Sequence, residues 1–353
     1  MTWLETVIIA IVEGLTEFLP VSSTGHMIIT QNLLGIEQGD PFVHAFTFII
    51  QFGAILSVVC LYWKRFFQFD HTPAPDSSIE TNTTGKRLCR DLDNKKVAGV
   101  LSGLAAYTNT DTLLWRLGTV VFTFLFGSGL LIYLILAIIM PTIGRPSWLQ
   151  RMRHKYYFYW LLFVGVLPAV VIGLAAKKSG LLDWLLDSVE VVAIMLVVGG
   201  VFMLFCDKLF NKGDDHTKVN EKRAFNIGLY QCISVIPGVS RSMATIVGGM
   251  TQGLTRKRAA EFSFFLAVPT MAGATLLDLL DLVKEDAVWA TSHNIMMLLL
   301  GCVVAFVVAL LAMKWFVAFL TKYGFKAFGI YRIIVGTIII VLLLTGHSLA
   351  MVD

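Results

Sequence analysis

The sequence predicts an all-α integral membrane protein with two inverted repeats, each holding a re-entrant broken-helix hairpin, plus an inserted small helical module. Of the 353 residues, 56% are hydrophobic and 15% are charged, so the chain is too apolar for a soluble globular protein. Several apolar runs approach the ~20 residues that a helix needs to cross a bilayer. The net charge of +4 is small and scattered at loop ends, which argues against a nucleic-acid partner.

The first polar segment within this apolar chain is EGLTEFLPVSSTGH, residues 13–26. Glu13 and Glu17 are four residues apart, so they share one face of a helix. Pro20 is expected to end that helix, because it lacks a backbone donor and clashes with the preceding turn. The hydroxyl residues that follow are good N-caps for a second helix: Ser22, Ser23 and Thr24. A break of this kind lines a cavity when it lies in a membrane, so we expect residues 3–34 to form a re-entrant hairpin.

A second polar segment, LYQCISVIPGVSRSMAT at 229–245, has the same order of features. An apolar helix is followed by Pro237, a break of small residues and a Ser-rich helix start. This segment therefore predicts a second re-entrant hairpin over about 224–252.

Weaker similarities extend the repeat beyond the two hairpins. The Phe-Thr-Phe at 46–48 matches the Phe-Ser-Phe at 262–264, at nearly the same offset as the two prolines. Apolar blocks starting at Gly165 and Gly301 also match, but their shorter offset implies roughly 80 extra residues in the first half. We therefore expect two inverted halves. Without the extra residues, these are about 1–206 and 222–346.

The remaining apolar runs predict full membrane spans. These lie near 43–63, 157–175, 189–206, 259–281, 295–320 and 328–346. A polar linker at 67–85, rich in Pro, Ser, Thr and Asn, is expected to be disordered. A basic linker at 142–155 and the Lys64-Arg65 pair place two loops on the cytoplasmic side by the positive-inside rule. The first residues lack a basic region and a clear cleavage site, so no removable signal peptide is expected.

The extra residues of the first half, 86–141, closely resemble the phage-shock-protein C family. The shared features are a short basic head that contains Gly, followed by an apolar segment with a central Gly-Ser-Gly. The resemblance implies a role in membrane-stress signalling and a membrane-stress partner for the insert. The Gly-Ser-Gly at 127–129 splits the apolar run 113–140 into two arms that are too short to cross, so we expect a shallow hairpin that returns to the cytoplasm.

The polar groups of the two hairpins suggest a phosphate site. An ionisable group within a membrane costs roughly 2.5–3.5 kcal/mol, so Glu13, Glu17 and Arg241 are kept because they pair or because they function. A structural ion pair is the alternative interpretation. However, each break also places a helix N-terminus beside serine hydroxyls, and helix N-termini bind phosphate. Arg241 adds a planar, bidentate phosphate ligand, so the hairpins predict a phosphate or pyrophosphate pocket.

Several residues near this pocket have two interpretations. Glu13 and Glu17 would repel the anion unless they act in acid–base chemistry or hold a divalent cation, Mg²⁺ or Ca²⁺. His26 lies on the same face as Ser23 and is within reach of acid–base work, but it could equally be a satisfied interior histidine. Thr245 faces the same side as Arg241 or bonds back to its own helix. The five dispersed cysteines predict packing roles and no metal or disulfide framework.

Three motifs carry a family resemblance. EGLTEFLPVSSTGH at 13–26 and PGVSRSMAT at 237–245 resemble the two signature motifs of the undecaprenyl-diphosphate phosphatase family, the bacitracin-resistance proteins, and EFSFFLAVP at 261–269 is similar to a third family block. The resemblance covers about 1–66 and 156–346, within a membrane core of 1–66 and 156–353. One departure is Met243, which stands where a Gly is expected and is expected to narrow the pocket.

The resemblance implies hydrolysis of undecaprenyl diphosphate to undecaprenyl phosphate and inorganic phosphate at the outer side of the bacterial inner membrane. This reaction recycles the lipid carrier for peptidoglycan and cell-wall synthesis, and bacitracin competes for the substrate. The expected catalytic residues are Glu13, Glu17, Ser23, His26 and Arg241, and the expected substrate-binding residues are Ser22, Thr24, Ser240, Ser242 and Thr245. Glu13 and Glu17 are also the candidate metal ligands.

Two mechanisms and two further functions are left open by the sequence. The expected nucleophile is Ser23, activated by His26 or Glu17, and a metal-activated water is the alternative. A lipid-phosphate transporter or flippase would use the same inverted-repeat pocket without hydrolysis. In another alternative, the insert is the signalling part and the phosphatase core is a scaffold. Whether the protein forms a homodimer is not determined by the sequence.

Overall fold

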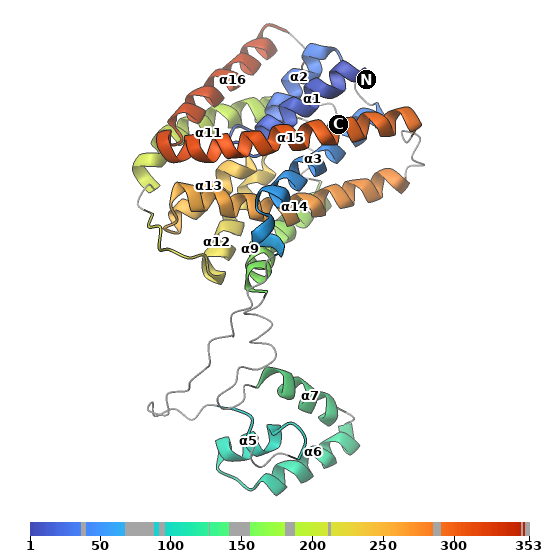
Figure 1. The fold of residues 1–353 in the computed structure, drawn as a ribbon, viewed down its shortest axis with the longest axis vertical. Coiled ribbons are helices and arrows are strands. Elements are labelled where there is room, and N and C mark those ends of the chain that lie inside the picture. The colour runs from blue at the N-terminus through green and yellow to red at the C-terminus, as the bar shows by residue number, and fades with distance from the viewer. Residues whose placement is uncertain are drawn as a thin grey trace. The chain divides into compact units, whose positions relative to one another are not determined.

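The computed structural model describes residues 1–36, 40–67, 88–91, 96–126, 128–140, 156–180, 188–210, 213–284, 291–346 and 349. The described elements are helices (Figure 1), and they belong to two compact units. The first unit contains Met1–Phe66 and Leu161–Asp353, and the second contains Phe67–Trp160. The predicted linkers at 67–85 and 142–155 lie outside the described residues, apart from Phe67.

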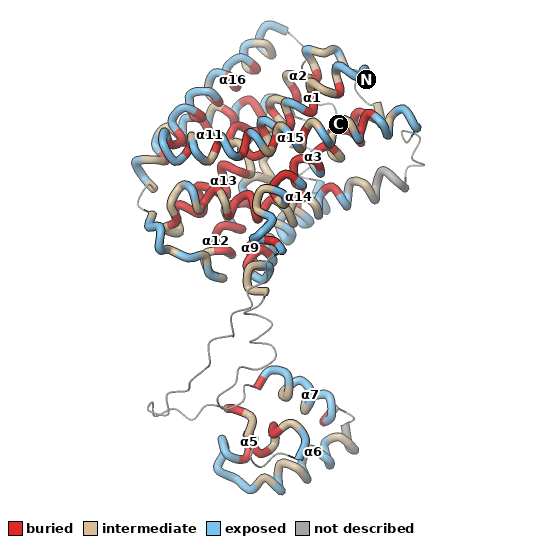
Figure 2. Tube along the Cα trace, in the orientation of Figure 1, coloured by how far each residue is buried: buried red, intermediate tan, exposed pale blue. Residues whose placement is uncertain are grey.

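Six of the described helices are long and apolar enough to cross a membrane. They are α3 (Pro41–Leu61), α9 (Tyr157–Lys178), α11 (Val189–Phe210), α14 (Arg256–Lys284), α15 (Ser292–Tyr323) and α16 (Lys326–Leu344). Each of the six predicted spans falls on one of these helices, which confirms the multi-pass membrane architecture. These helices have exposed stretches (pale blue in Figure 2). Large apolar side chains are exposed there, such as Val303 and Leu311 of α15, as expected for surfaces in contact with lipid.

The first hairpin consists of α1 (Trp3–Thr16) and α2 (Ser23–Leu34), which pack on each other. A capping box between Thr2 and Glu5 fixes the start of α1. The helix ends at Thr16, before Pro20, so the proline lies in the turn between the two arms. With 14 and 12 residues, the arms are at most about 21 Å long and cannot cross a hydrocarbon core of ~30 Å.

The second hairpin has the same plan. It contains α12 (Glu221–Gln231), the 3₁₀ turn η1 (Cys232–Val235) and α13 (Arg241–Thr251). Asn220 caps α12 by accepting a hydrogen bond from the backbone N–H of Arg223. Pro237 falls in the break before α13, as predicted. Both α-helical arms have 11 residues and are therefore also too short to cross the bilayer.

The spanning helices hold the two hairpins in place. Helix α1 packs on α15, α2 on α11 and α13 on α14, while α14 and α15 both pack on α3. The approach of α3 to α15 is so close that a Cβ atom at Gly53 would lie 2.2 Å from the backbone oxygen of Cys302. Ile9, Phe46 and Ala305 form part of the buried cluster at this junction. The hairpins therefore rest on a packed helical frame.

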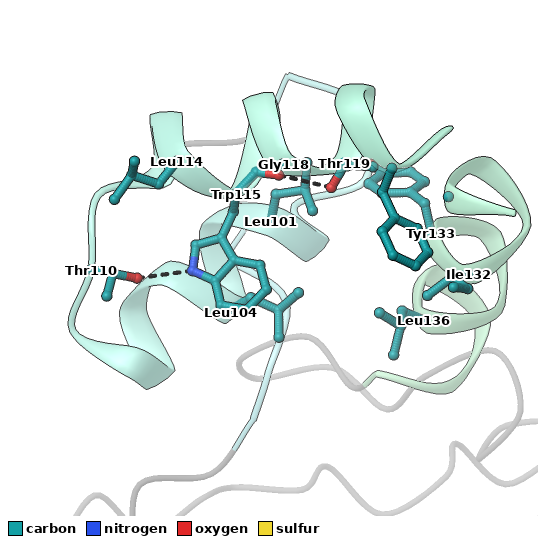
Figure 3. A pocket seen from close by; sticks show the side chains of 12 residues that line it. Leu101, Leu104, Thr110, Leu114, Trp115, Gly118, Thr119, Ile132, Tyr133 and Leu136 are labelled. Carbon is teal, nitrogen blue, oxygen red and sulfur yellow. Dashed lines mark hydrogen bonds between the residues drawn. The ribbon is translucent and has the colours of Figure 1, made fainter. Parts of the chain in front are cut away.

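The second unit contains three short helices, α5 (Val100–Thr108), α6 (Thr112–Phe126) and α7 (Gly129–Ile139), and they contact one another. The predicted break in the apolar run is present, because α6 ends before residue 127 and α7 begins at Gly129. A cavity of about 560 Å³ lies among the three helices (Figure 3). Its lining is mostly apolar, and the indole N–H of Trp115 donates to the hydroxyl of Thr110 at 2.8 Å. Among the described residues that line it there is no carboxylate, arginine or lysine, and Tyr133 is a titratable side chain in the lining.

The remaining short helix, α4 (Trp63–Phe67), follows α3. It contains the Lys64-Arg65 pair that the sequence places at the cytoplasmic end of the first span.

Candidate active site

A polar cavity of about 270 Å³ lies where the tips of the two hairpins meet. Its lining comes from both hairpins and from the flanking helices α3 and α14. The lining residues are Glu17, Ser22, Ser23, Thr24, Gln51, Ser234, Ile236, Pro237, Gly238, Ser240, Arg241, Thr270, Met271 and Ala274. Segments more than 200 positions apart in the sequence thus form one site.

Hydrogen bonds directly connect Glu17, Ser23 and Arg241 in this cavity. Glu17, at the end of α1, accepts a hydrogen bond from Ser23 Oγ to its Oε2 at 2.6 Å. Its other oxygen, Oε1, pairs with Arg241 Nη2 at 3.0 Å. Both partners of this ion pair are largely buried, with side-chain exposures of 10% for Glu17 and 15% for Arg241. The carboxylate therefore holds a serine from its own hairpin and a cation from the other.

Arg241 has a donor atom that takes no part in its ion pair with Glu17. Its Nη1 atom is buried and has no hydrogen-bond partner among the described residues. A buried donor without a partner is rare in proteins, since burial without a hydrogen bond is costly. An anion in the cavity would satisfy it.

The two second arms begin with the same unusual backbone conformation. Ser22, the N-cap of α2, has φ 70° and ψ 101°, and Ser240, the N-cap of α13, has φ 72° and ψ 113°. Positive φ is uncommon for residues other than glycine and is often found at functional sites. Ser240 also caps its helix, because its Oγ accepts a hydrogen bond from the N–H of Met243. These conformations orient both helix starts.

Ser242 and Thr245 are absent from the cavity lining, although the sequence predicts that they bind substrate. Ser242 Oγ donates to the backbone oxygen of Leu19 at 2.7 Å and so joins the two hairpins. Thr245 Oγ1 donates to the backbone oxygen of Arg241 at 2.9 Å and is hydrogen-bonded to Ser263. The bond back to its own helix matches the structural alternative for Thr245.

Glu13 and His26 also lie outside the cavity lining. Glu13 is 1% exposed, and its Oε1 has no hydrogen-bond partner among the described residues. The two ring nitrogens of His26 are both engaged: Nδ1 with the backbone oxygen of Ser22 at 2.8 Å and Nε2 with the hydroxyl of Tyr331 at 2.7 Å. The imidazole therefore bonds to α16 and to the turn before α2.

The structure thus brings six of the predicted site residues together around the cavity: Glu17, Ser22, Ser23, Thr24, Ser240 and Arg241. Met243, expected to narrow the pocket, is also outside the lining. Sequence reasoning did not identify Ser234 and Thr270 as lining residues, because single hydroxyls in apolar helices are common. Gln51 of α3 also lines the cavity.

Arg332 is a further residue that was not identified from the sequence. It is fully buried in α16, beneath the two hairpin tips. A signal was available, since an arginine inside an apolar span is expensive and is usually kept for a reason.

Comparisons with known proteins agree with one another. The model of the family described as "Bacitracin resistance protein BacA" matches residues 6–140 and 135–338. The chain is 44% identical to an undecaprenyl-diphosphatase of Porphyromonas gingivalis over 351 residues, which is 99% of this chain and 100% of that protein. It is 40% identical to the undecaprenyl-diphosphatases of Bdellovibrio bacteriovorus and Flavobacterium psychrophilum, over the full length of each chain.

These alignments include the second unit of the structure. The segment at 86–141 is therefore shared with relatives and is covered almost entirely by the family match. Nothing in the comparisons supports its likeness to phage-shock-protein C.

Proposed function

The chain belongs to the bacitracin resistance protein family, and we propose that it hydrolyses undecaprenyl diphosphate to undecaprenyl phosphate and inorganic phosphate. Full-length relatives with 40–44% identity are undecaprenyl-diphosphatases, which supports this activity. The single observation at the site that carries the proposal is the buried, unpartnered Nη1 of Arg241 in a cavity formed by two helix starts. A guanidinium and helix N-termini together are suited to a diphosphate.

Substrate binding would use groups from both hairpins. Arg241 Nη1 donates to a phosphate oxygen, while the helix starts at Ser23 and Arg241 direct their positive dipole ends at the anion. The hydroxyls of Thr24 and Ser240 line the same cavity and supply further hydrogen bonds. The isoprenoid tail remains among the apolar helices and the lipid.

The nucleophile in this mechanism is Ser23. Its Oγ attacks the terminal phosphorus, and its proton passes to Glu17 Oε2, which lies 2.6 Å away. The bond from that phosphorus to the bridging oxygen breaks, and undecaprenyl phosphate leaves with the electron pair. Water then hydrolyses the phosphoserine and releases inorganic phosphate. Both ring nitrogens of His26 already have hydrogen-bond partners, so we assign the base to Glu17. His26 would instead hold the turn at Ser22.

The described part of the site offers few ligands for a divalent cation. No group of three or more His, Cys, Asp or Glu side chains suited to a metal occurs among the described residues. Glu13 Oε1 has no hydrogen-bond partner in the described part of the chain, whereas both oxygens of Glu17 are engaged. Mg²⁺ is often bound by one or two carboxylates together with substrate phosphates. Glu13 and Glu17 would hold such an ion, which would neutralise phosphate charge and lower the pKa of a bound water.

Two further proposals concern the orientation of the active site in the membrane and the internal repeat of the chain. We place the active site at the outer side of the bacterial inner membrane, where bacitracin competes for the lipid diphosphate. The matching conformations of Ser22 and Ser240 support an inverted repeat of the two hairpins. The likeness of residues 86–141 to phage-shock-protein C, with its membrane-stress partner, stays a prediction.

The proposal is tested by measuring phosphate release from undecaprenyl diphosphate with purified protein in detergent micelles. Release by the parent chain and its loss in Arg241→Ala are expected, because the variant lacks the guanidinium that grips the anion. A parallel reaction with a chelator tests the cation, since loss of turnover would show that one is needed. Binding of the lipid without any phosphate release would contradict hydrolysis and favour the transporter alternative.

A further inference from the structure

Arg332 is the largest fully buried side chain outside the cavity, and its guanidinium joins three parts of the fold. It donates to the first hairpin through the backbone oxygen of Pro20 at 3.2 Å. It donates to the second hairpin through the oxygens of Gly238 at 2.6 Å and Val239 at 2.9 Å. It also donates to α11, at the oxygens of Met195 and Leu196.

None of these hydrogen-bond partners is a carboxylate. Five backbone oxygens and the sulfur of Met243 accept from this guanidinium. Burying an arginine in this way is expensive unless every donor is used, and here the donors fix the two hairpin tips to each other. Met243, the departure from the family motif, contacts Arg332 rather than the cavity.

The contacts also determine how two peptide groups are oriented. The described chain has no cis peptide bonds, and in a trans peptide the C=O and N–H point in opposite directions. Because the oxygens of Pro20 and Val239 point at Arg332, the N–H groups of Val21 and Ser240 point away from it. Neither N–H has a hydrogen-bond partner among the described residues. Ser240 lines the cavity; Val21 is not among the lining residues, but it directly precedes Ser22, which is.

We propose that Arg332 is a positioning residue that aligns one peptide N–H from each hairpin, at Val21 and Ser240, to bind the phosphate oxygens of the substrate. The inference rests on the proposed function and adds two donors to it. Arg332 touches no substrate. It acts through the backbone of the two tips, in the way that preorganised N–H groups stabilise charge that develops in a transition state.

Gly199 in α11 provides a way to disturb Arg332 without removing it. A Cβ atom at Gly199 would lie 2.5 Å from Arg332 Nη2 and 2.9 Å from its Cζ. The guanidinium is the end of a flexible side chain, so it would shift while the helices stay in place. A helix interior is also more stable with alanine than with glycine, so Gly199→Ala is expected to fold. This variant keeps the charge of Arg332 and changes only its position.

The experiment compares Gly199→Ala and Arg332→Lys with two matched controls. Gly173→Ala makes the same change where a Cβ meets nothing within 4 Å. Arg223→Lys changes a guanidinium that also donates to two backbone oxygens, at Lys218 and Gln252, away from the cavity. Three quantities are measured: kcat/KM for undecaprenyl diphosphate, the thermal midpoint without ligand, and the rise of that midpoint with inorganic pyrophosphate.

For the two test variants we expect kcat/KM to fall about 10- to 100-fold, because a displacement of about 1 Å can cost that much in rate. The rise with pyrophosphate should shrink in the folded protein of both variants, beyond any fall in the midpoint without ligand that follows from the loss of buried hydrogen bonds. Both controls should match the parent in all three quantities. A purely structural role would instead lower the ligand-free midpoint and leave the activity of the folded fraction unchanged.

Parent-like kcat/KM and pyrophosphate response in folded Gly199→Ala would overturn the proposal. So would a failure of both test variants to fold, since Arg332 would then be a structural residue. If only Arg332→Lys fails to fold, Gly199→Ala decides. If the parent releases no phosphate from the lipid, the proposed function fails, while the pyrophosphate response still decides the role of Arg332.

Discussion

At the scale of single residues, the site depends on one carboxylate with two partners. Glu17 accepts from Ser23 and pairs with Arg241, so the same group can take the proton of a nucleophile and hold the cation that binds the anion. The sequence predicted these three residues because ionisable groups and clustered hydroxyls are conspicuous in an apolar segment. It could not predict that both nitrogens of His26 are engaged, because Tyr331 approaches only in the folded chain.

The role of Ser23 gives a direct prediction. Ser23→Ala should lower kcat by at least about 10³-fold, because loss of a nucleophile removes the covalent route. Phosphate release measures this effect, and Ser57→Ala is a suitable control because its hydroxyl donates to Ala54 within α3. Near-normal turnover by Ser23→Ala would exclude the phosphoserine intermediate and favour attack by water.

A second prediction concerns the base. Glu17→Gln should reduce turnover strongly even though glutamine has nearly the same shape, because the amide cannot take the proton from Ser23 or neutralise Arg241. Single-turnover phosphate release from undecaprenyl diphosphate measures the chemical step. The matched variant is Glu5→Gln, at the exposed capping box of α1, which should retain turnover. A fast chemical step in Glu17→Gln would assign the base to another group.

At the scale of elements, the two hairpins and the six spans were predictable, because apolar length, Pro and clustered hydroxyls are local signals. The end of α1 was less predictable. The helix stops at Thr16 and leaves Glu17 in the cap, where it can turn toward Arg241. Positive φ at Ser22 and Ser240 also could not be predicted, since no glycine marks either position.

The contact between α3 and α15 yields a stability prediction. Gly53→Ala should destabilise the protein by about 1–3 kcal/mol, because the added methyl group would meet the backbone of Cys302 and force the helices apart. The thermal midpoint in detergent reports this change, and Gly173→Ala is again the neutral comparison. An unchanged midpoint would mean that the two helices can separate at little cost.

At the scale of the whole molecule, the described residues that line the candidate active site all belong to the first unit. The cavity between the hairpins is lined by the charged side chains Glu17 and Arg241, whereas the cavity among α5, α6 and α7 is mostly apolar. Internal similarity of the hairpins suggested extra residues in the first half. The sequence likened these residues to phage-shock-protein C, and the comparisons give that likeness no support. Short basic and apolar patterns recur in unrelated membrane modules, so they are weak evidence of a relationship.

Deletion tests this separation. Removing residues 70–145 should leave phosphate release by the purified protein unchanged, because none of the residues of this segment that the structure describes lines the polar cavity. The thermal midpoint serves as the control for folding of the remaining core. A folded deletion variant without turnover would show that the second unit takes part in hydrolysis.

The ion pair between the hairpins has a consequence for the catalytic cycle. Glu17 occupies one edge of the Arg241 guanidinium, so under the proposed mechanism the protein carries its own counter-ion where the diphosphate would bind. Entry of the lipid is then an exchange of one anion for another, which limits how tightly the head group is held. When inorganic phosphate departs, the carboxylate is already in place to reclaim the cation. Turnover gains from this competition, since a site that held its product as tightly as its substrate would stall.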